Sequence, residues 1–164
     1  FPPVNSMLGP VGERWVPVHG FLPHSRLGEA WARIQALFAA RATEMEQLGV
    51  GAGAMFAAVS PSACLIEPVF FWPDAIEALH RRSVERDHLK RLQGFPANPA
   101  ARALVTELRA ALVGLFTDIG AAHLQIARTY RLKDAHDPAA WALLEAVKRA
   151  VDPQRRMNPG SLGL

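Results

Sequence analysis

Two short apolar segments separated by a turn constrain the fold of this chain more than any other feature. Residues 54–59 and 64–72 are both apolar, and Ser60-Pro61-Ser62-Ala63 lies between them. Such a pair of segments, joined by a turn that contains proline and serine, is typical of a β-hairpin. We therefore expect an antiparallel sheet in which these two strands are neighbours.

The segments around this hairpin predict an α+β fold. Apolar side chains at three- and four-residue spacing indicate helices, and Asn98-Pro99 and Asp137-Pro138 are typical helix starts. We predict strands over residues 14–21 and 120–130, and helices over residues 25–48, 74–92, 99–119 and 138–151. The order contains a βαββαβ pattern. This predicts a ferredoxin-like antiparallel sheet with helices packed on one face, followed by a C-terminal helix and an extended tail.

Composition excludes several classes of function. At 164 residues the chain is one domain, or two small subdomains that share a core, and its basic residues are scattered among acids with a formal net charge of only +3. This is typical of a solvated mixed surface, so we predict no nucleic-acid binding. Cys64 is the single cysteine, the six histidines show no metal-ligand spacing, and no apolar run reaches the ~20 residues of a membrane span.

The segment from Gly120 to Tyr130 carries the strongest candidates for catalysis. Alternation along a strand places His123 and Gln125 on one polar face, close to Arg128 and Tyr130. A histidine can move protons near neutral pH, an arginine can bind a carboxylate at two points, and a tyrosine hydroxyl can donate to an oxyanion or take a proton. The alternative is that His123 makes a structural hydrogen bond and that Arg128 is a surface charge.

A carboxylate interrupts the second strand of the hairpin. Glu67 shares a face with Val69 and Phe71 if the strand alternates regularly. Glu67 either lines a cavity, in which case Glu67 and Phe71 are candidate substrate-binding residues, or it points to solvent.

The C-terminus is punctuated by prolines. Asp152-Pro153 ends the last helix, and Asn158-Pro159-Gly160 follows a few residues later. Proline cannot continue a helix and disfavours helical geometry in the residue before it. We predict an extended tail of fixed shape that contacts another part of the protein.

Several of these motifs together resemble a known family. Residues 147–153 (Val-Lys-Arg-Ala-Val-Asp-Pro), followed by Met-Asn-Pro-Gly over 157–160, look like the terminal signature of FAD-linked oxidases and dehydrogenases of the vanillyl-alcohol oxidase superfamily. Residues 15–20, 66–68, 71–74 and 120–130 are similar to further segments of D-lactate-dehydrogenase-like members. The resemblance covers nearly the whole chain.

The resemblance implies a division of the chain and a cofactor. Residues 1–13 would be a linker from an N-terminal FAD-binding domain, 14–151 the cap or substrate domain, and 152–164 a tail that returns to the flavin domain. Asn158, Pro159 and Gly160 would then contact FAD, and the strand face around His123 would line the substrate site. The Gly-Asp-Gly-Asn-x-His and Glu-His-Gly segments that accompany a metal in many 2-hydroxy-acid members do not occur. We therefore predict no metal site.

The resulting functional prediction is an FAD-dependent oxidoreductase. Its substrate would carry a hydroxyl group, as a 2-hydroxy acid, an alcohol or a phenolic alcohol, and lose a hydride to flavin. We expect a cytoplasmic protein, with peripheral membrane association and homo-oligomerisation as open alternatives, and an inactive isolated fragment. The rival predictions are a non-catalytic ferredoxin-like ligand-binding or dimerisation module and a structural helical interaction domain.

Overall fold

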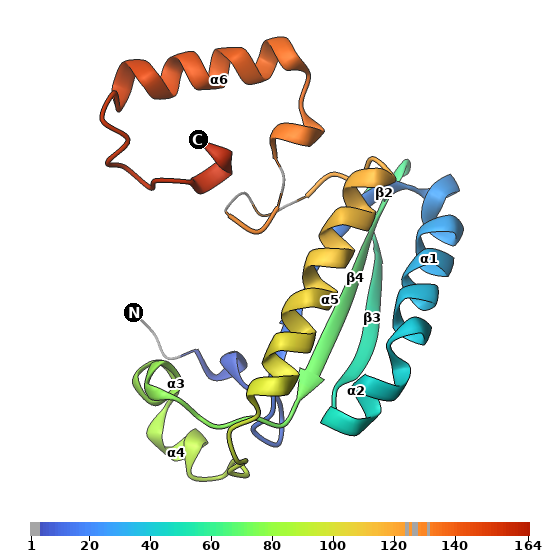
Figure 1. The fold of residues 1–164 in the computed structure, drawn as a ribbon, viewed down its shortest axis with the longest axis vertical. Coiled ribbons are helices and arrows are strands. Elements are labelled where there is room, and N and C mark those ends of the chain that lie inside the picture. The colour runs from blue at the N-terminus through green and yellow to red at the C-terminus, as the bar shows by residue number, and fades with distance from the viewer. Residues whose placement is uncertain (1–3, 124, 126–127, 131) are drawn as a thin grey trace.

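The fold is built around one long strand, β4 (Ala63–Trp72). The structure, a computed structural model, describes residues 4–123, 125, 128–130 and 132–164. Strand β3 (Gly51–Ala58) pairs with nearly the whole length of β4, while β1 (Arg14–Pro17) and β2 (Gly20–Pro23) pair with its two ends. All these pairings are antiparallel. Because β3 occupies one edge of β4, β1 and β2 share the other edge (Figure 1).

The predicted hairpin is confirmed, and its register separates two faces of the sheet. Cys64, Ile66 and Phe70 are buried, whereas Phe71 and its neighbours at alternate positions are half-buried or exposed. In the partner strand, Met55 lies opposite Glu67 on the more exposed face. The sheet therefore has one face in the core and one that remains partly open to solvent.

The predicted first strand is wrong as a single element, because it is broken into β1 and β2. Pro17 ends β1, and Pro68 lies beside the break on β4. Neither proline has an N–H group to donate to the ladder. Across the break, the amide of Val18 donates to the carbonyl of Pro68 at 2.9 Å. The chain between the two strands can therefore turn His19 away from regular pairing.

The predicted strand over residues 120–130 is reduced to one bridge in the described part of the chain. Ala122 and Phe21 exchange two backbone hydrogen bonds of 2.8 and 3.0 Å in antiparallel geometry. Residues 124, 126 and 127 of the predicted strand lie outside the described residues. The bridge places this segment on the free edge of β2, which is the position of the last strand in a ferredoxin-like sheet. The predicted α+β class, with helices on one face of the sheet, is confirmed.

Three helices cover the buried face of the sheet: α1 (Leu27–Ala40), α2 (Ala42–Leu48) and α5 (Pro99–Asp118). The core between them contains Ile34, Ile66, Phe70, Leu108 and Phe116, all of which are almost completely buried. The prediction of one helix over 25–48 is wrong, because a break at Arg41 separates α1 from α2. The guanidinium of Arg41 binds carboxylates on both α2 and α5.

The predicted helix over 74–92 is also wrong, because α3 (Ala78–Ser83) and α4 (Arg86–Leu89) replace it. Asp74 does not cap a helix. Its buried carboxylate accepts hydrogen bonds from Arg102, Trp72 and the backbone amides of Ala75 and Asn98. Glu77 caps α3 instead, in a reciprocal capping box with His80. The chain after β4 is therefore irregular, because Asp74 bonds to groups at the N-terminus of α5 instead of starting a helix.

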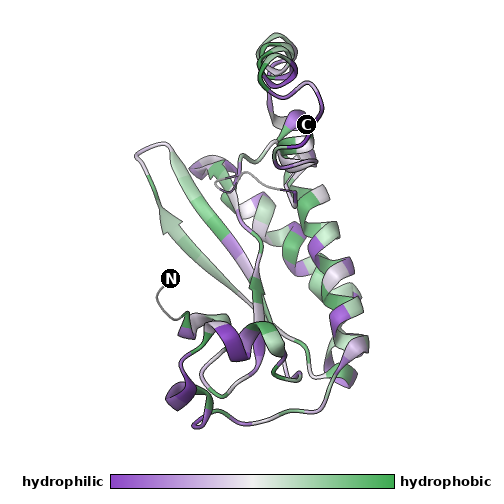
Figure 2. Ribbon diagram, turned by 90° about the vertical axis from the view of Figure 1, so that its left-hand side faces the viewer, coloured by the Kyte–Doolittle hydropathy of each residue, from purple (hydrophilic) through white to green (hydrophobic). Residues whose placement is uncertain are grey.

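The last helix, α6 (Pro138–Val151), lies apart from the helix-covered sheet in Figure 1. Asn98 and Asp137 cap α5 and α6 as predicted, each accepting hydrogen bonds from backbone amides of the first turn. None of the helices in the described ranges is sufficiently long and apolar to cross a membrane. Figure 2 shows that the hairpin strands are mostly hydrophobic and that α5 lies on one side of them.

The prediction of an extended tail is wrong, because the tail reverses direction and returns toward α6. Arg155, Asn158 and Leu162 have left-handed φ values of 51°, 46° and 64°, and Gly160 has a φ of 77°. These backbone conformations bend the chain sharply. Asn tolerates left-handed geometry better than most residues, which suits Asn158 to its position in the turn.

Candidate functional site

A cluster of His19, His123 and Tyr130 occupies the break between β1 and β2. His19 and Tyr130 are almost fully buried, and His123 is half-buried. The ring of His123 stacks on that of Tyr130 with 4.2 Å between centroids, and the ring of His19 is 4.7 Å from that of Tyr130. The irregular backbone at the break makes room for these rings within an otherwise apolar core.

Hydrogen bonds fix the protonation of His19. Its Nε2 atom accepts a hydrogen bond from the backbone amide of Gln125 at 3.2 Å, so this nitrogen carries a lone pair. In the neutral ring the proton is then on Nδ1, which lies 2.9 Å from the Tyr130 hydroxyl oxygen and donates to it. The amide of His19 donates to the same oxygen at 3.2 Å. Burial, and to a smaller extent the proximity of His123, lower the pKa of His19 and keep the ring neutral.

His123 is arranged as a proton acceptor. Its Nδ1 atom lies 2.8 Å from the carbonyl oxygen of His19 and must donate to it, because a carbonyl can only accept. The lone pair of neutral His123 is therefore on Nε2. Burial lowers the pKa of His123, and the bond to His19 opposes this effect only partly. At neutral pH the imidazole can take a proton on Nε2.

Tyr130 is suited to donate a hydrogen bond. Burial raises the pKa of its hydroxyl, although the His19 backbone bond and the charge of Arg109 act in the opposite direction. Glu67 raises the pKa further. A phenol with a raised pKa stays protonated at neutral pH. Of the two roles predicted for Tyr130, this environment favours donation over proton abstraction.

The structure separates the predicted substrate residues into two groups. His123 lies on the side of the sheet covered by α5, since its ring contacts Phe116 at 6.1 Å between centroids. Glu67 and Phe71 lie on the other, more open face. Gln125 is exposed, and its backbone amide contacts His19. At the break between β1 and β2, Tyr130 contacts the His19 amide and is affected by the charges of Glu67 and Arg109.

Arg128 connects this cluster to the tail. Its Nη2 atom donates to the carbonyl oxygen of Pro159 at 2.6 Å. This bond brings the Asn158-Pro159-Gly160 turn to the segment that carries Tyr130. The side chain of Asn158 is exposed and has no hydrogen-bond partner among the described residues. The turn thus presents an unpaired amide among the described residues, next to the end of α6.

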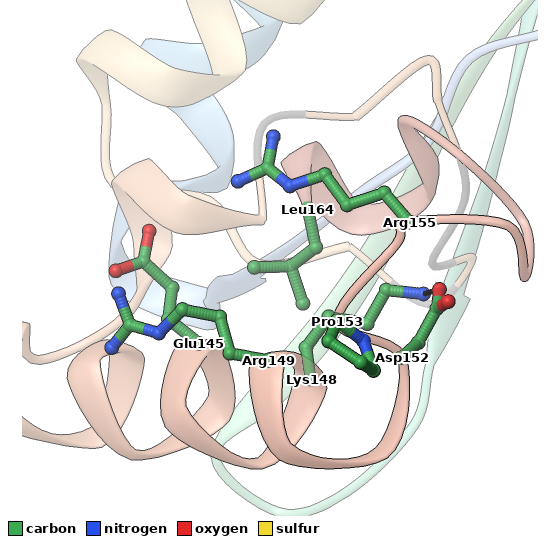
Figure 3. A pocket seen from close by; sticks show the side chains of 7 residues that line it. All are labelled: Glu145, Lys148, Arg149, Asp152, Pro153, Arg155 and Leu164. Atoms are coloured by element: carbon green, nitrogen blue, oxygen red, sulfur yellow. Dashed lines mark hydrogen bonds and ion pairs between the residues drawn. The ribbon is translucent and has the colours of Figure 1, made fainter.

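Asp152 holds the tail against α6. Its buried carboxylate accepts hydrogen bonds from Lys148 at 2.6 Å and from the amides of Arg156 and Met157 at 2.9 and 3.0 Å. Lys148 also donates to the carbonyl of Met157. These bonds lower the pKa of Asp152, with that from Lys148 the largest cause. Figure 3 shows Leu164, at the end of the tail, directed back toward the same helix.

Replacement of Asp152 by alanine should release the tail. The amides of Arg156 and Met157 would lose their acceptor, so the exposed Arg155–Arg156 segment should be cleaved by trypsin faster, by roughly tenfold. Mass spectrometry of a limited digest measures this rate. Asp87→Ala is the matched control, since Asp87 forms only an exposed ion pair with Lys90. Equal cleavage of both variants would show that Asp152 does not hold the tail.

Sequence reasoning missed two residues of this site. The sequence assigns His19 no role beyond its place in the segment 15–20, and it does not single out Arg109. The position of His19 next to a glycine and after a proline was a signal of irregular backbone. Arg109 carried no local signal, because its importance comes from its proximity to Tyr130.

A comparison with protein families matches residues 100–162 to FAD linked oxidases, C-terminal domain. The match includes α5, the segment with His123, Arg128 and Tyr130, α6 and the Asn-Pro-Gly turn. Comparisons with curated proteins and with solved structures gave no match. Residues 100–162 of this chain are therefore similar to the C-terminal domain of FAD linked oxidases.

Proposed function

We propose that the chain forms the substrate-covering C-terminal part of an FAD-dependent oxidoreductase that oxidises a hydroxyl-bearing substrate. The substrate would be a 2-hydroxy acid, an alcohol or a phenolic alcohol. The family match supports the FAD-linked class. The hydrogen bond from Arg128 to Pro159 carries the structural argument, because it joins the proposed cofactor-contacting turn to the segment with the proton-transfer groups.

The Asn158-Pro159-Gly160 turn fits a contact with the polar edge of a flavin. Two left-handed residues shape the turn, and Asp152 and Arg128 hold it at both sides. Its asparagine amide offers both donors and an acceptor that no described residue uses. When bound, FAD would supply the acceptor for the hydride that leaves the hydroxyl-bearing carbon. The N-terminal FAD-binding domain of the same protein would hold most of this cofactor.

The residues of this chain would supply proton transfer and orientation. His123 would accept the hydroxyl proton on Nε2, while its Nδ1–H group stays bonded to His19. Tyr130 would donate a hydrogen bond to the substrate oxygen. Arg128 would orient the substrate through guanidinium nitrogens other than Nη2, which holds Pro159. Gln125 would form part of the wall of the substrate site, whereas Glu67 and Phe71 lie on the opposite face of the sheet from His123.

A protein that contains this chain together with an FAD-binding domain tests the proposal. We expect the purified protein to show flavin absorbance, and Asn158→Ala to weaken flavin retention by roughly tenfold, the effect of losing one or two hydrogen bonds. Flavin absorbance after gel filtration measures retention. Gln154→Ala is the control, because it changes another exposed tail residue. A colourless wild-type protein would argue strongly against the proposed function.

One observation favours the alternative of a dimerisation module. Leu143, Val147 and Val151 follow one another at four-residue spacing on α6 and are exposed by 66%, 53% and 69%. Such a stripe is typical of a helix face that packs against a partner. Under this alternative the chain alone would dimerise in analytical ultracentrifugation, and Val147→Glu would return it to a monomer. Under the proposed function the chain alone would be monomeric.

A further inference from the structure

A small cavity lies beside α5 at the segment that leads to Tyr130. Thr106, Arg109, Ala110 and Val113 form one face of the helix, and Thr129 closes the other side. The cavity has a volume of about 250 Å³. This is slightly smaller than typical sites for drug-sized ligands, so it suits a small organic molecule.

Arg109 lines this cavity without a partner for its charge. Its Nε atom is buried and forms no hydrogen bond within the described part of the chain. Its guanidinium also forms no ion pair with any described carboxylate, whereas Arg102 on the same helix binds both Asp74 and Glu77. A buried donor that lacks an acceptor is unfavourable, and a guanidinium bonds most strongly to an acceptor that is charged. The site therefore lacks an acceptor with negative charge.

The remaining walls of the cavity define the shape of that acceptor. The hydroxyl of Thr106 donates to the carbonyl of Arg102 at 2.7 Å, so it can only accept a further hydrogen bond. The hydroxyl of Thr129 donates to no described residue. Ala110 and Val113 add apolar surface. A guanidinium and one free hydroxyl suit a planar carboxylate, and the apolar wall suits a short alkyl group.

We propose that this cavity binds a small carboxylic acid, whose carboxylate is held by Arg109 and Thr129 and whose alkyl group contacts Ala110 and Val113. The charge of Arg109 also acts on Tyr130. The carboxylate could belong to the substrate of the proposed reaction or to a separate acid that acts on the neighbouring cluster. Binding by the chain itself does not depend on the proposed function.

Titration of the chain with propionate tests the site directly. The Nε–H signal of Arg109 in a proton–nitrogen NMR spectrum should shift and saturate with propionate, and should not shift with the neutral analogue propionamide. We expect Arg109→Gln to abolish saturable binding. Arg109→Lys should weaken it by roughly tenfold or more, because lysine lacks the planar fork. Arg81→Gln, on the exposed surface of α3, is the matched control and should bind normally.

A second measurement separates binding from a structural role of Arg109. Without ligand, Arg109→Met should unfold at the same temperature as the wild type or higher, since it removes an unsatisfied buried donor and keeps the volume. With propionate, only the wild type should gain in melting temperature. Destabilised or misfolded Arg109→Met, equal shifts with propionamide, or equal loss of binding in Arg81→Gln would each overturn the proposal.

The source of the carboxylate is decided in a protein that also contains the FAD-binding domain. Propionate inhibition that is competitive with a 2-hydroxy acid would assign the cavity to the substrate. Inhibition or activation that is not competitive would assign it to a separate acid. A protein without turnover would contradict the proposed function, while the NMR titration would still decide whether the cavity binds a carboxylate.

Discussion

Replacement of Asp74 by alanine is expected to destabilise the chain by about 3 kcal/mol, the cost of breaking a buried ion pair from one side. The carboxylate is completely buried and accepts hydrogen bonds from Arg102, Trp72 and two backbone amides. These groups join the end of β4 to the start of α5. Alanine would leave Trp72 and the two amides without this acceptor, and Arg102 with only its pair to Glu77. Urea unfolding followed by circular dichroism measures the difference.

The same residue should produce a characteristic pH dependence. Burial acts to raise the pKa of Asp74, but the hydrogen bonds from Arg102, Asn98, Ala75 and Trp72 outweigh it and hold the pKa well below its usual range. The unfolded chain has the ordinary value of about 3.9. Below that pH the unfolded state binds more protons than the folded state, so stability falls as the pH decreases. Above it the contribution of Asp74 is fully present.

Asp74→Asn and Asp118→Ala complete this test. Asp74→Asn should be less stable at pH 7 and should lose less stability than the wild type between about pH 4 and pH 2. Asp118 forms only a half-exposed pair with Arg33 at 3.6 Å. Its replacement should change stability by about 0.5 kcal/mol or less. A similar small effect of Asp74→Ala would contradict the assignment of Asp74 as the link between β4 and α5.

Replacement of His123 by glutamine should reduce turnover by about 100-fold in a protein that joins this chain to an FAD-binding domain, the usual contribution of a general base. The reason is the lone pair on Nε2, which the bond from Nδ1 to His19 fixes in position. Steady-state kinetics measures the effect. Because burial lowers the pKa of His123, the acidic limb of the wild-type rate should lie below pH 6.5.

His136→Gln is the matched control for this experiment. Its Nδ1 atom also contacts a backbone carbonyl, that of Leu132 at 2.9 Å, but the residue is exposed. We expect its turnover and its pH profile to equal those of the wild type. If His123→Gln keeps the acidic limb and the turnover of the wild type, His123 has the structural role that the sequence left open. In that case the role of His123 would be to donate the hydrogen bond to the His19 carbonyl.

The elements that could be predicted from sequence are those that local residues specify. The hairpin follows from two apolar segments and a turn, and the starts of α5 and α6 follow from Asn98-Pro99 and Asp137-Pro138. Their hydrogen bonds involve residues within one turn of the cap. Propensity and capping are short-range effects, so they can be recognised without knowledge of the fold.

The errors occurred where distant residues compete with local preference. Asp74 and Glu77 together resemble a helix start, but Arg102 and Asn98 engage Asp74 instead. The tail was predicted as extended because of its prolines, yet the Asp152 carboxylate bends it back by binding the amides of Arg156 and Met157. A buried carboxylate must be neutralised by whatever donors surround it, and this requirement overrides local propensity.

By itself, the sequence determined the α+β class, the hairpin, the caps of the two later helices and the resemblance to FAD-linked oxidases. It also singled out His123, Arg128, Tyr130 and the Asn-Pro-Gly turn as candidates. Only the tertiary structure joined Tyr130 to His19, placed Arg128 against Pro159 and left Arg109 without a partner. The physical reason is distance along the chain. Residues 111 positions apart meet only because the sheet breaks beside Pro17 and Pro68, and no local pattern encodes the contact.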